Sequence, residues 1–198
     1  MDTSSINVGS LKAAVKNLGY DFFENGDYNL NIIGIRANPG TPNKFDDVIC
    51  VAYKENDEWK LKKYTCTTDP GLYYLNNPCN VNGTAILKEG QYKGGFRKGL
   101  HKGQYAALVQ NKNLPLYRDN NRDNEHDMVE DTVSVEMAGI NIHHSSATGT
   151  STQVDKWSAG CQVFADINEF NEFMAIVDKS AAKYGEVFTY TLINQKDL

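Results

Sequence analysis

Several features that mark whole classes of protein are missing from this sequence. Its 198 residues include four cysteines but no Cys-x-x-Cys pair, so the spacing typical of a zinc site is absent. No apolar run approaches the ~20 residues that span a membrane, and the N-terminus has no charged segment followed by an apolar one. We therefore expect no membrane span, and a protein made in the cytoplasm without a signal peptide.

An excess of basic residues is also missing. The net charge is −5, and no stripe of lysine or arginine offsets it, which argues against nucleic acid as a partner. The one basic stretch, KGGFRKGLHKG at 93–103, is expected to be a solvated loop. A second interpretation stays open, in which this region forms a lid or a wall that binds a substrate carboxylate. Its residues are Tyr92, Arg97, Lys98, His101 and Tyr105, of which Tyr92, Arg97 and His101 are the candidate substrate-binding residues.

Two of the four cysteines have an ordinary explanation. Cys50 and Cys66 lie on consecutive predicted strands, where they either face each other or are buried separately. Burial is favoured because free cysteine behaves as a small apolar residue, and a chain of this length is stable without disulfides. Cys161 differs from them, since its neighbours are polar and turn-forming.

Alternating apolar and β-branched residues dominate the chain after its first segment. A short amphipathic helix is expected at 10–19, capped by Ser10. The period becomes helical again after Cys161, between a cap at Asp166, paired with Glu169 in a capping box, and a stop at Gly185. Strands are predicted at 29–37, 47–54, 58–68, 83–90, 104–110, 114–119, 132–143 and 186–193.

These elements predict an α+β protein made mainly of antiparallel strands, with one main helix after Cys161. Residues 1–28 are interpreted as a helical appendage packed on a domain formed by residues 29–198. Such an architecture by itself implies no function.

Chemistry is concentrated in the stretch GINIHHSSATGTSTQVDKWSAGCQVF, residues 139–164. His143 and His144 are adjacent, and neighbouring strand residues point to opposite faces, so the two are not expected to bind one metal ion. A structural role is the default for an isolated cysteine and histidine. Here the small residues 158–160 favour a tight turn whose backbone N–H groups point toward the Cys161 sulfur. That arrangement suits a cysteine nucleophile with a histidine base.

At this point the sequence resembles the L,D-transpeptidase catalytic domain. That family carries a histidine at the end of an apolar strand, followed at a similar distance by Ser/Thr-His-Gly-Cys. Here His143 follows the apolar run INI, and fourteen residues separate it from Ser158-Ala159-Gly160-Cys161. The resemblance implies a β-sandwich or barrel with a helix after the catalytic cysteine.

The resemblance also implies a role for each matching residue. Cys161 would be the nucleophile and His143 its base. The residue after the base supplies a backbone carbonyl that orients the imidazole, which here is His144, with the Ser145 hydroxyl nearby. Ser158 and Gly160 would shape the turn and, with Cys161, the oxyanion hole.

The turn departs from the family pattern at one position. The family histidine is replaced by Ala159, which removes a polar group beside the site. His144 is a hypothetical replacement for it in space. Ser145 and Ala159 join Tyr92, Arg97 and His101 as candidate substrate-binding residues.

The function implied is that of a peptidoglycan-directed cysteine enzyme without cofactor or metal, whose partner is a D-amino-acid-containing stem peptide. An acyl-enzyme forms on Cys161, and water or an amine releases it, so that peptidase cleavage and transpeptidation both stay open. The missing leader favours hydrolysis by a phage-lysin-like enzyme that acts on the cell wall after release or delivery by other machinery. The alternative is a catalytically inactive wall-binding or virion-associated module. The oligomeric state is left open.

Overall fold

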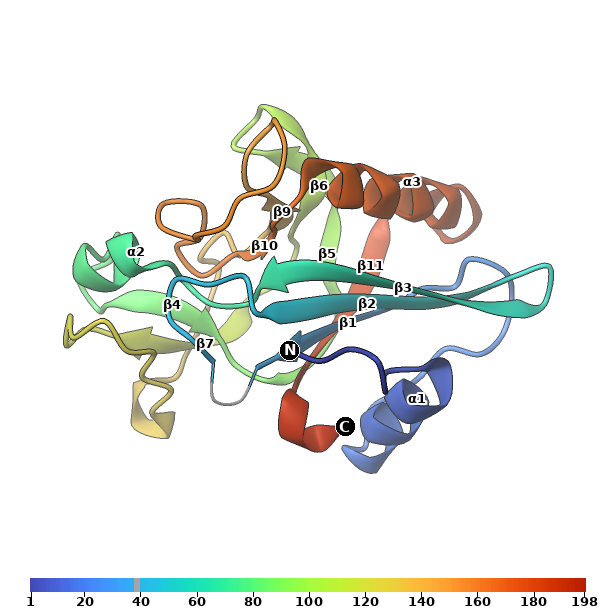
Figure 1. The fold of residues 1–198 in the computed structure, drawn as a ribbon, viewed down its shortest axis with the longest axis horizontal. Helices are drawn as coiled ribbons and strands as arrows, with labels where there is room; N and C mark the ends of the chain where they lie inside the picture. The colour runs from blue at the N-terminus through green and yellow to red at the C-terminus, as the bar shows by residue number, and fades with distance from the viewer. Residues whose placement is uncertain (38–39) are drawn as a thin grey trace.

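Eight strands close into a barrel in the computed structural model, which describes residues 1–37 and 40–198 (Figure 1). Around the barrel the order is β1-β11-β5-β6-β9-β10-β3-β2. Two neighbouring pairs, β1 with β11 and β9 with β10, are parallel, and the remaining pairs are antiparallel. The barrel strands are β1 (Asn31–Arg36), β2 (Asp47–Glu55), β3 (Glu58–Thr67), β5 (Gly90–His101), β6 (Tyr105–Gln110), β9 (Ile142–His144), β10 (Gln162–Phe164) and β11 (Val187–Asn194).

A second, smaller sheet and three α-helices complete the described part of the chain. The order of the smaller sheet is β4-β7-β8. The expected α+β class with mainly antiparallel strands is therefore confirmed. These further elements are α1 (Val8–Asn17), α2 (Leu72–Asn76), α3 (Ile167–Tyr184), β4 (Thr84–Leu87), β7 (Leu114–Asp119) and β8 (Ser134–Glu136), with 3-10 turns at Glu130–Thr132 and Gln195–Asp197. Within the described residues, no helix is long and apolar enough to cross a membrane.

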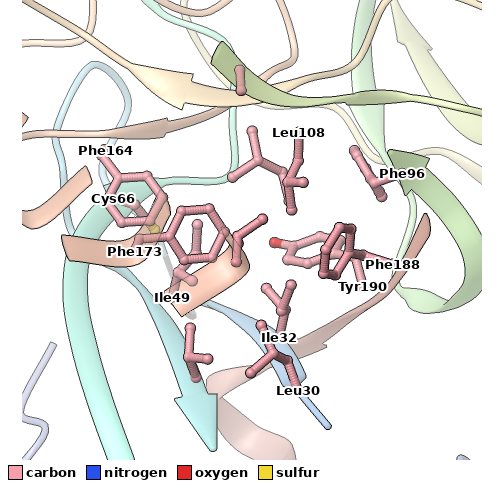
Figure 2. Close-up of a cluster of buried hydrophobic side chains, with 14 of the residues drawn as sticks. Leu30, Ile32, Ile49, Cys66, Phe96, Leu108, Phe164, Phe173, Phe188 and Tyr190 are labelled. Carbon is pink, nitrogen blue, oxygen red and sulfur yellow. The ribbon is translucent and has the colours of Figure 1, made fainter. Parts of the chain in front are cut away.

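The barrel interior is filled by aromatic and aliphatic side chains, joined by the apolar face of α3. In Figure 2, Phe164 and Phe173 lie on one side of this cluster and Tyr190 lies on the other. Gly34 makes room for the Tyr190 ring, because a Cβ atom at residue 34 would lie 1.9 Å from the Tyr190 hydroxyl oxygen. That hydroxyl donates a hydrogen bond to Gln162 over 2.8 Å, which ties β11 to β10.

The first two strands of the barrel are buried on both faces. Ile32 points into the interior, whereas Ile33 and Cys50 pack on the outside against α1. This explains why NIIGIR and DVICVAY read as continuous apolar runs. Cys50 and Cys66 are both buried and free, in different clusters, so the expectation of separate burial is confirmed.

The helix ends follow their caps, with two corrections. Asn7, rather than Ser10, caps α1, and the Ser10 side chain completes the capping box by accepting the Asn7 N–H over 3.0 Å. Asp166 caps α3 and Gly185 ends it, as predicted. The Glu169 side chain does not bond back to that cap, since it accepts a hydrogen bond from the Thr65 N–H of β3.

Two expectations about strands were wrong, and one strand, β10, was not predicted. The basic stretch 93–103 is not a loop, since most of it belongs to β5, which is hydrogen-bonded to β11 and β6. Pairing on both sides overrides the weak strand propensity of glycine and lysine. The strand expected at 132–143 divides into β8 and β9 around Gly139, whose φ is +76°. The three residues of β10 are too few to show a pattern.

Candidate active site

A cavity of about 610 Å³ separates the outer face of the barrel wall from the small sheet. The small sheet contributes Ala85 and Glu136, and the barrel side contributes the end of β9 and the turn before β10. The hairpin between β5 and β6 adds His101 and Lys102. Segments that are far apart in sequence therefore meet at one place, and Cys161 and His143 both line it.

The turn that carries Cys161 is held by its own side chains. The buried Ser158 hydroxyl accepts the Gly160 N–H over 3.1 Å and donates to the Cys161 carbonyl over 2.8 Å. Gly160 has a φ of +119°, and a Cβ atom there would lie 2.4 Å from the Ala85 carbonyl oxygen. Only glycine fits that conformation and that close approach to β4. The Gly160 N–H is thus engaged in the turn, while the Cys161 N–H has no partner within the described part of the chain.

The Cys161 sulfur is in the thiol form at rest. It accepts the Asn141 N–H over 3.4 Å and donates to the Gly139 carbonyl over 3.5 Å. Burial raises the pKa of Cys161 above its ordinary value, although the Asn141 hydrogen bond and the Lys102 charge act in the opposite direction. A thiol in this state would need a base to become a nucleophile.

His143 has the geometry of such a base. Its Nδ1 lies 2.7 Å from the His144 carbonyl oxygen and 3.2 Å from the Tyr105 hydroxyl. A carbonyl oxygen only accepts, so Nδ1 carries the proton and Nε2 presents its lone pair. Nε2 is buried and has no hydrogen-bond partner among the described residues. Burial, and secondarily His101, lowers the pKa of His143 to about 3, which keeps the ring neutral.

Strand pairing places the base and the thiol on one face. In the parallel ladder of β9 and β10, Val163 lies opposite His143 and Gln162 opposite Ile142. Because side chains alternate, His143 and Cys161 both point to the cavity side. His144 points to the barrel interior, where it stacks on Tyr105 at 4.1 Å between ring centroids. The two histidines face opposite ways, and His144 therefore does not replace the histidine missing at residue 159.

A second histidine reaches the cavity from the β5–β6 hairpin. The His101 ring stacks on the His143 ring, with centroids 3.9 Å apart and planes inclined by 21°. The Asn141 amide nitrogen lies 3.0 Å from His101 Nδ1, and the Asn141 carbonyl oxygen accepts the Gln110 N–H. Since the amide nitrogen donates, His101 accepts at Nδ1 and carries its proton on Nε2. Burial lowers the pKa of His101 to about 4.

Of the other candidate residues, one lines the cavity and three do not. Ala159 lines the cavity with Cys161. Tyr92 is buried elsewhere and donates to the Lys88 carbonyl, and Arg97 bonds to the Lys98 carbonyl over 3.4 Å. The buried Ser145 hydroxyl donates to the Ala165 carbonyl over 3.1 Å. Tyr92, Arg97 and Ser145 are thus not brought to the cavity.

Sequence reasoning missed Asn141 and Lys102. Asn141 stands two residues before His143, so strand alternation alone places it on the same face. No local pattern identifies Lys102, because the register of a distant hairpin brings it to the cavity. Across residues 1–37 and 40–198, no group of three or more histidine, cysteine or acidic residues is placed to hold a metal ion.

Comparison with known proteins adds no relative. No protein-family model, no curated protein and no solved structure matches this chain.

Proposed function

We propose that this protein is a cysteine acyl-transfer enzyme of the L,D-transpeptidase type that acts on stem peptides of peptidoglycan. One observation carries the proposal: His143, whose Nε2 is buried without a hydrogen-bond partner among the described residues, lines the same cavity as Cys161. The Nδ1 contact to the His144 carbonyl, which the resemblance implies, is present at 2.7 Å. A neutral base held in one tautomer beside a thiol supports nucleophilic catalysis.

Acylation begins from the neutral pair. Rotation about the Cβ–S bond turns the Cys161 proton from the Gly139 carbonyl toward His143, whose Nε2 takes it as the sulfur attacks the carbonyl carbon. The C–S bond forms, and the carbonyl π electrons move to oxygen, where the Cys161 N–H stabilises the negative charge. Collapse of this intermediate breaks the C–N bond, and the His143 imidazolium gives its proton to the leaving amine. A thioester on Cys161 remains.

Deacylation repeats the same steps with a second nucleophile. His143 Nε2 takes a proton from water or from an amine, which attacks the thioester carbon, and the Cys161 thiolate leaves and is reprotonated by His143. Water gives peptidase cleavage, and an amine gives transpeptidation. Both outcomes share the acylation step.

Incubation with purified muropeptides, followed by mass analysis, tests the proposal. Loss of a terminal D-residue, cleavage of a crosslink or formation of one is expected with the parent protein and not with Cys161→Ala. Cys79→Ala is a matched control, since Cys79 lines the same cavity with an exposed side chain. If no stem peptide changes mass, the proposed substrate class is wrong.

A further inference from the structure

The charged side chains around the cavity do not balance one another. Those that line it are Lys102, Arg118, Glu136 and Lys156. Arg118 is paired with Glu136, with Nη2 2.8 Å from a carboxylate oxygen, and Nη1 donates to the Gly83 carbonyl over 2.9 Å. The Lys156 ammonium lies over the Tyr73 ring, 4.2 Å from its centroid. Among the described residues, neither lysine forms an ion pair, so a protein of net charge −5 holds a positively charged cavity.

His101 adds an unpartnered donor to this cavity. Its side chain is 6% exposed, its Nδ1 is turned to Asn141, and its proton is therefore on Nε2. In the described part of the chain, Nε2 of His101 forms no hydrogen bond. It is also absent from the set of fully buried side-chain atoms without a partner, so it keeps some solvent exposure. This nitrogen is consequently open to the cavity, next in sequence to the unpaired ammonium of Lys102.

We propose that His101 and Lys102 form a binding site for a carboxylate of the acyl donor, beside Cys161. An N–H group and an ammonium group are complementary to a carboxylate, which accepts hydrogen bonds and carries negative charge. The site names the substrate class more closely: an acyl donor with a free carboxylate near the bond that is attacked. That last statement rests on the proposed function, whereas the site itself does not.

Competition between two alkylating reagents tests the site without any turnover. Iodoacetate carries a carboxylate and iodoacetamide is its neutral counterpart, so the ratio of their rates at Cys161 cancels changes in thiol reactivity. A Cys79→Ser background removes the exposed second thiol of the cavity. Modification of Cys161 is followed by peptide mass, and N-acetylcysteine gives the reference ratio.

The iodoacetate-to-iodoacetamide ratio is expected to exceed that of N-acetylcysteine by about threefold to tenfold at low ionic strength. It falls toward the reference in Lys102→Gln and in concentrated salt, and Lys102→Arg retains most of it. His101→Phe keeps a stacked ring without the N–H and lowers the ratio by about twofold. Lys183→Gln, which removes a charge that lies over Tyr28, leaves the ratio unchanged.

The results distinguish failure of the carboxylate site from failure of the proposed function. A parent ratio equal to that of N-acetylcysteine, or a ratio that Lys102→Gln does not change, overturns the carboxylate site whatever the enzyme activity. A raised, Lys102-dependent ratio supports the site even if every muropeptide stays intact, in which case the proposed function alone fails. With an active enzyme, Lys102→Gln raises KM several-fold for a peptide with a free carboxylate and leaves KM for its amide unchanged.

Discussion

Two polar regions of this protein are equally buried and differ in how their groups are paired. The first, the Arg36 cluster, comprises Arg36, Asp69 and Glu89, in which the arginine lies 2.8 Å from each carboxylate and also donates to the Leu87 carbonyl over 2.9 Å. The second is the Cys161 cavity, where His143 Nε2 is buried without a partner. Arg36 and His143 are 2% and 3% exposed, so burial does not distinguish the two regions.

The difference in pairing indicates what each region does. A buried group without a partner costs about 1–3 kcal/mol, so most buried polar groups in proteins are hydrogen-bonded. In the Arg36 cluster every charge has a partner of opposite sign: Asp69 Oδ1, which forms no hydrogen bond among the described residues, lies 2.8 Å from Arg36 Nε. The cluster joins β1 to the turn after β3 and to the end of β4. The Cys161 cavity departs from that rule at His143 Nε2, the atom of the proposed base. We infer that the first region stabilises the fold and the second supports chemistry.

Replacement of the nucleophile gives the largest expected effect. Cys161→Ala is expected to lower turnover by about 10⁴-fold or more, because the proposed nucleophile is lost. The free energy of unfolding is expected to stay within about 1 kcal/mol of the parent value. Muropeptide turnover and urea denaturation measure the two quantities. Retained turnover in Cys161→Ala would remove the chemical role of the cavity.

Separate replacement of His143 and His144 compares two adjacent residues of β9 that are expected to have different roles. His143→Ala is expected to lower kcat by about 10²- to 10⁴-fold, because the general base is lost. His144→Ala loses the stack on Tyr105 and the contact to the Ser145 carbonyl, and is expected to cost about 1–3 kcal/mol of stability with turnover retained. Loss of activity only in His144→Ala would mean that the base is wrongly assigned.

Removal of Arg36 tests whether the Arg36 cluster stabilises the fold. Arg36→Met leaves Asp69 and Glu89 without their cation and is expected to reduce the free energy of unfolding by about 3–5 kcal/mol. Turnover per folded molecule is expected to stay near the parent value, because Arg36 does not line the cavity. Chemical denaturation, with activity normalised to the folded fraction, measures both. A stable but inactive Arg36→Met protein would mean that the Arg36 cluster supports activity and not stability.

The pH dependence of thiol reactivity gives the smallest predicted step, about tenfold for one pH unit. Burial raises the pKa of Cys161 and lowers that of His143 to about 3, so neutral pH favours a neutral thiol beside a neutral imidazole. In a Cys79→Ser background, alkylation of Cys161 by iodoacetamide is expected to rise about tenfold per pH unit from pH ~5 up to at least the ordinary thiol pKa of ~8.5. A plateau between pH ~5 and ~7 would indicate a thiolate–imidazolium pair instead.

The sequence predicts those parts of the fold in which a local pattern decides the structure. β2, β3, β11 and α3 are predicted because a β-branched apolar run, alternation or helical periodicity is visible in the local sequence of each. The sequence predicts a loop at residues 93–103, because only the pairing of β5 with β11 and β6 makes a strand of these glycines and lysines. Tertiary partners decide such segments, and they are not visible in one sequence.

The candidate site also combines residues that a local pattern predicts with residues that only tertiary contacts place there. The sequence predicts Cys161 and His143 as site residues because their spacing and the small turn residues are local features, and the structure places both in one cavity lining. His101 was named only within a basic stretch, since its stack on His143 depends on how a distant hairpin meets β9. Tyr92 and Arg97 share that stretch and lie away from the cavity, because their positions on β5 direct them elsewhere.

Capture of the acyl-enzyme tests the central claim most directly. The parent protein is mixed with stem peptide, quenched in acid within seconds and digested. The mass of the peptide that contains Cys161 is then measured by mass spectrometry. A thioester adduct with the mass of the acyl part of the stem is expected on Cys161, removable by hydroxylamine and much reduced in His143→Ala. An adduct on any other residue, or turnover of the stem with no adduct on Cys161 at any quench time, would contradict the central claim.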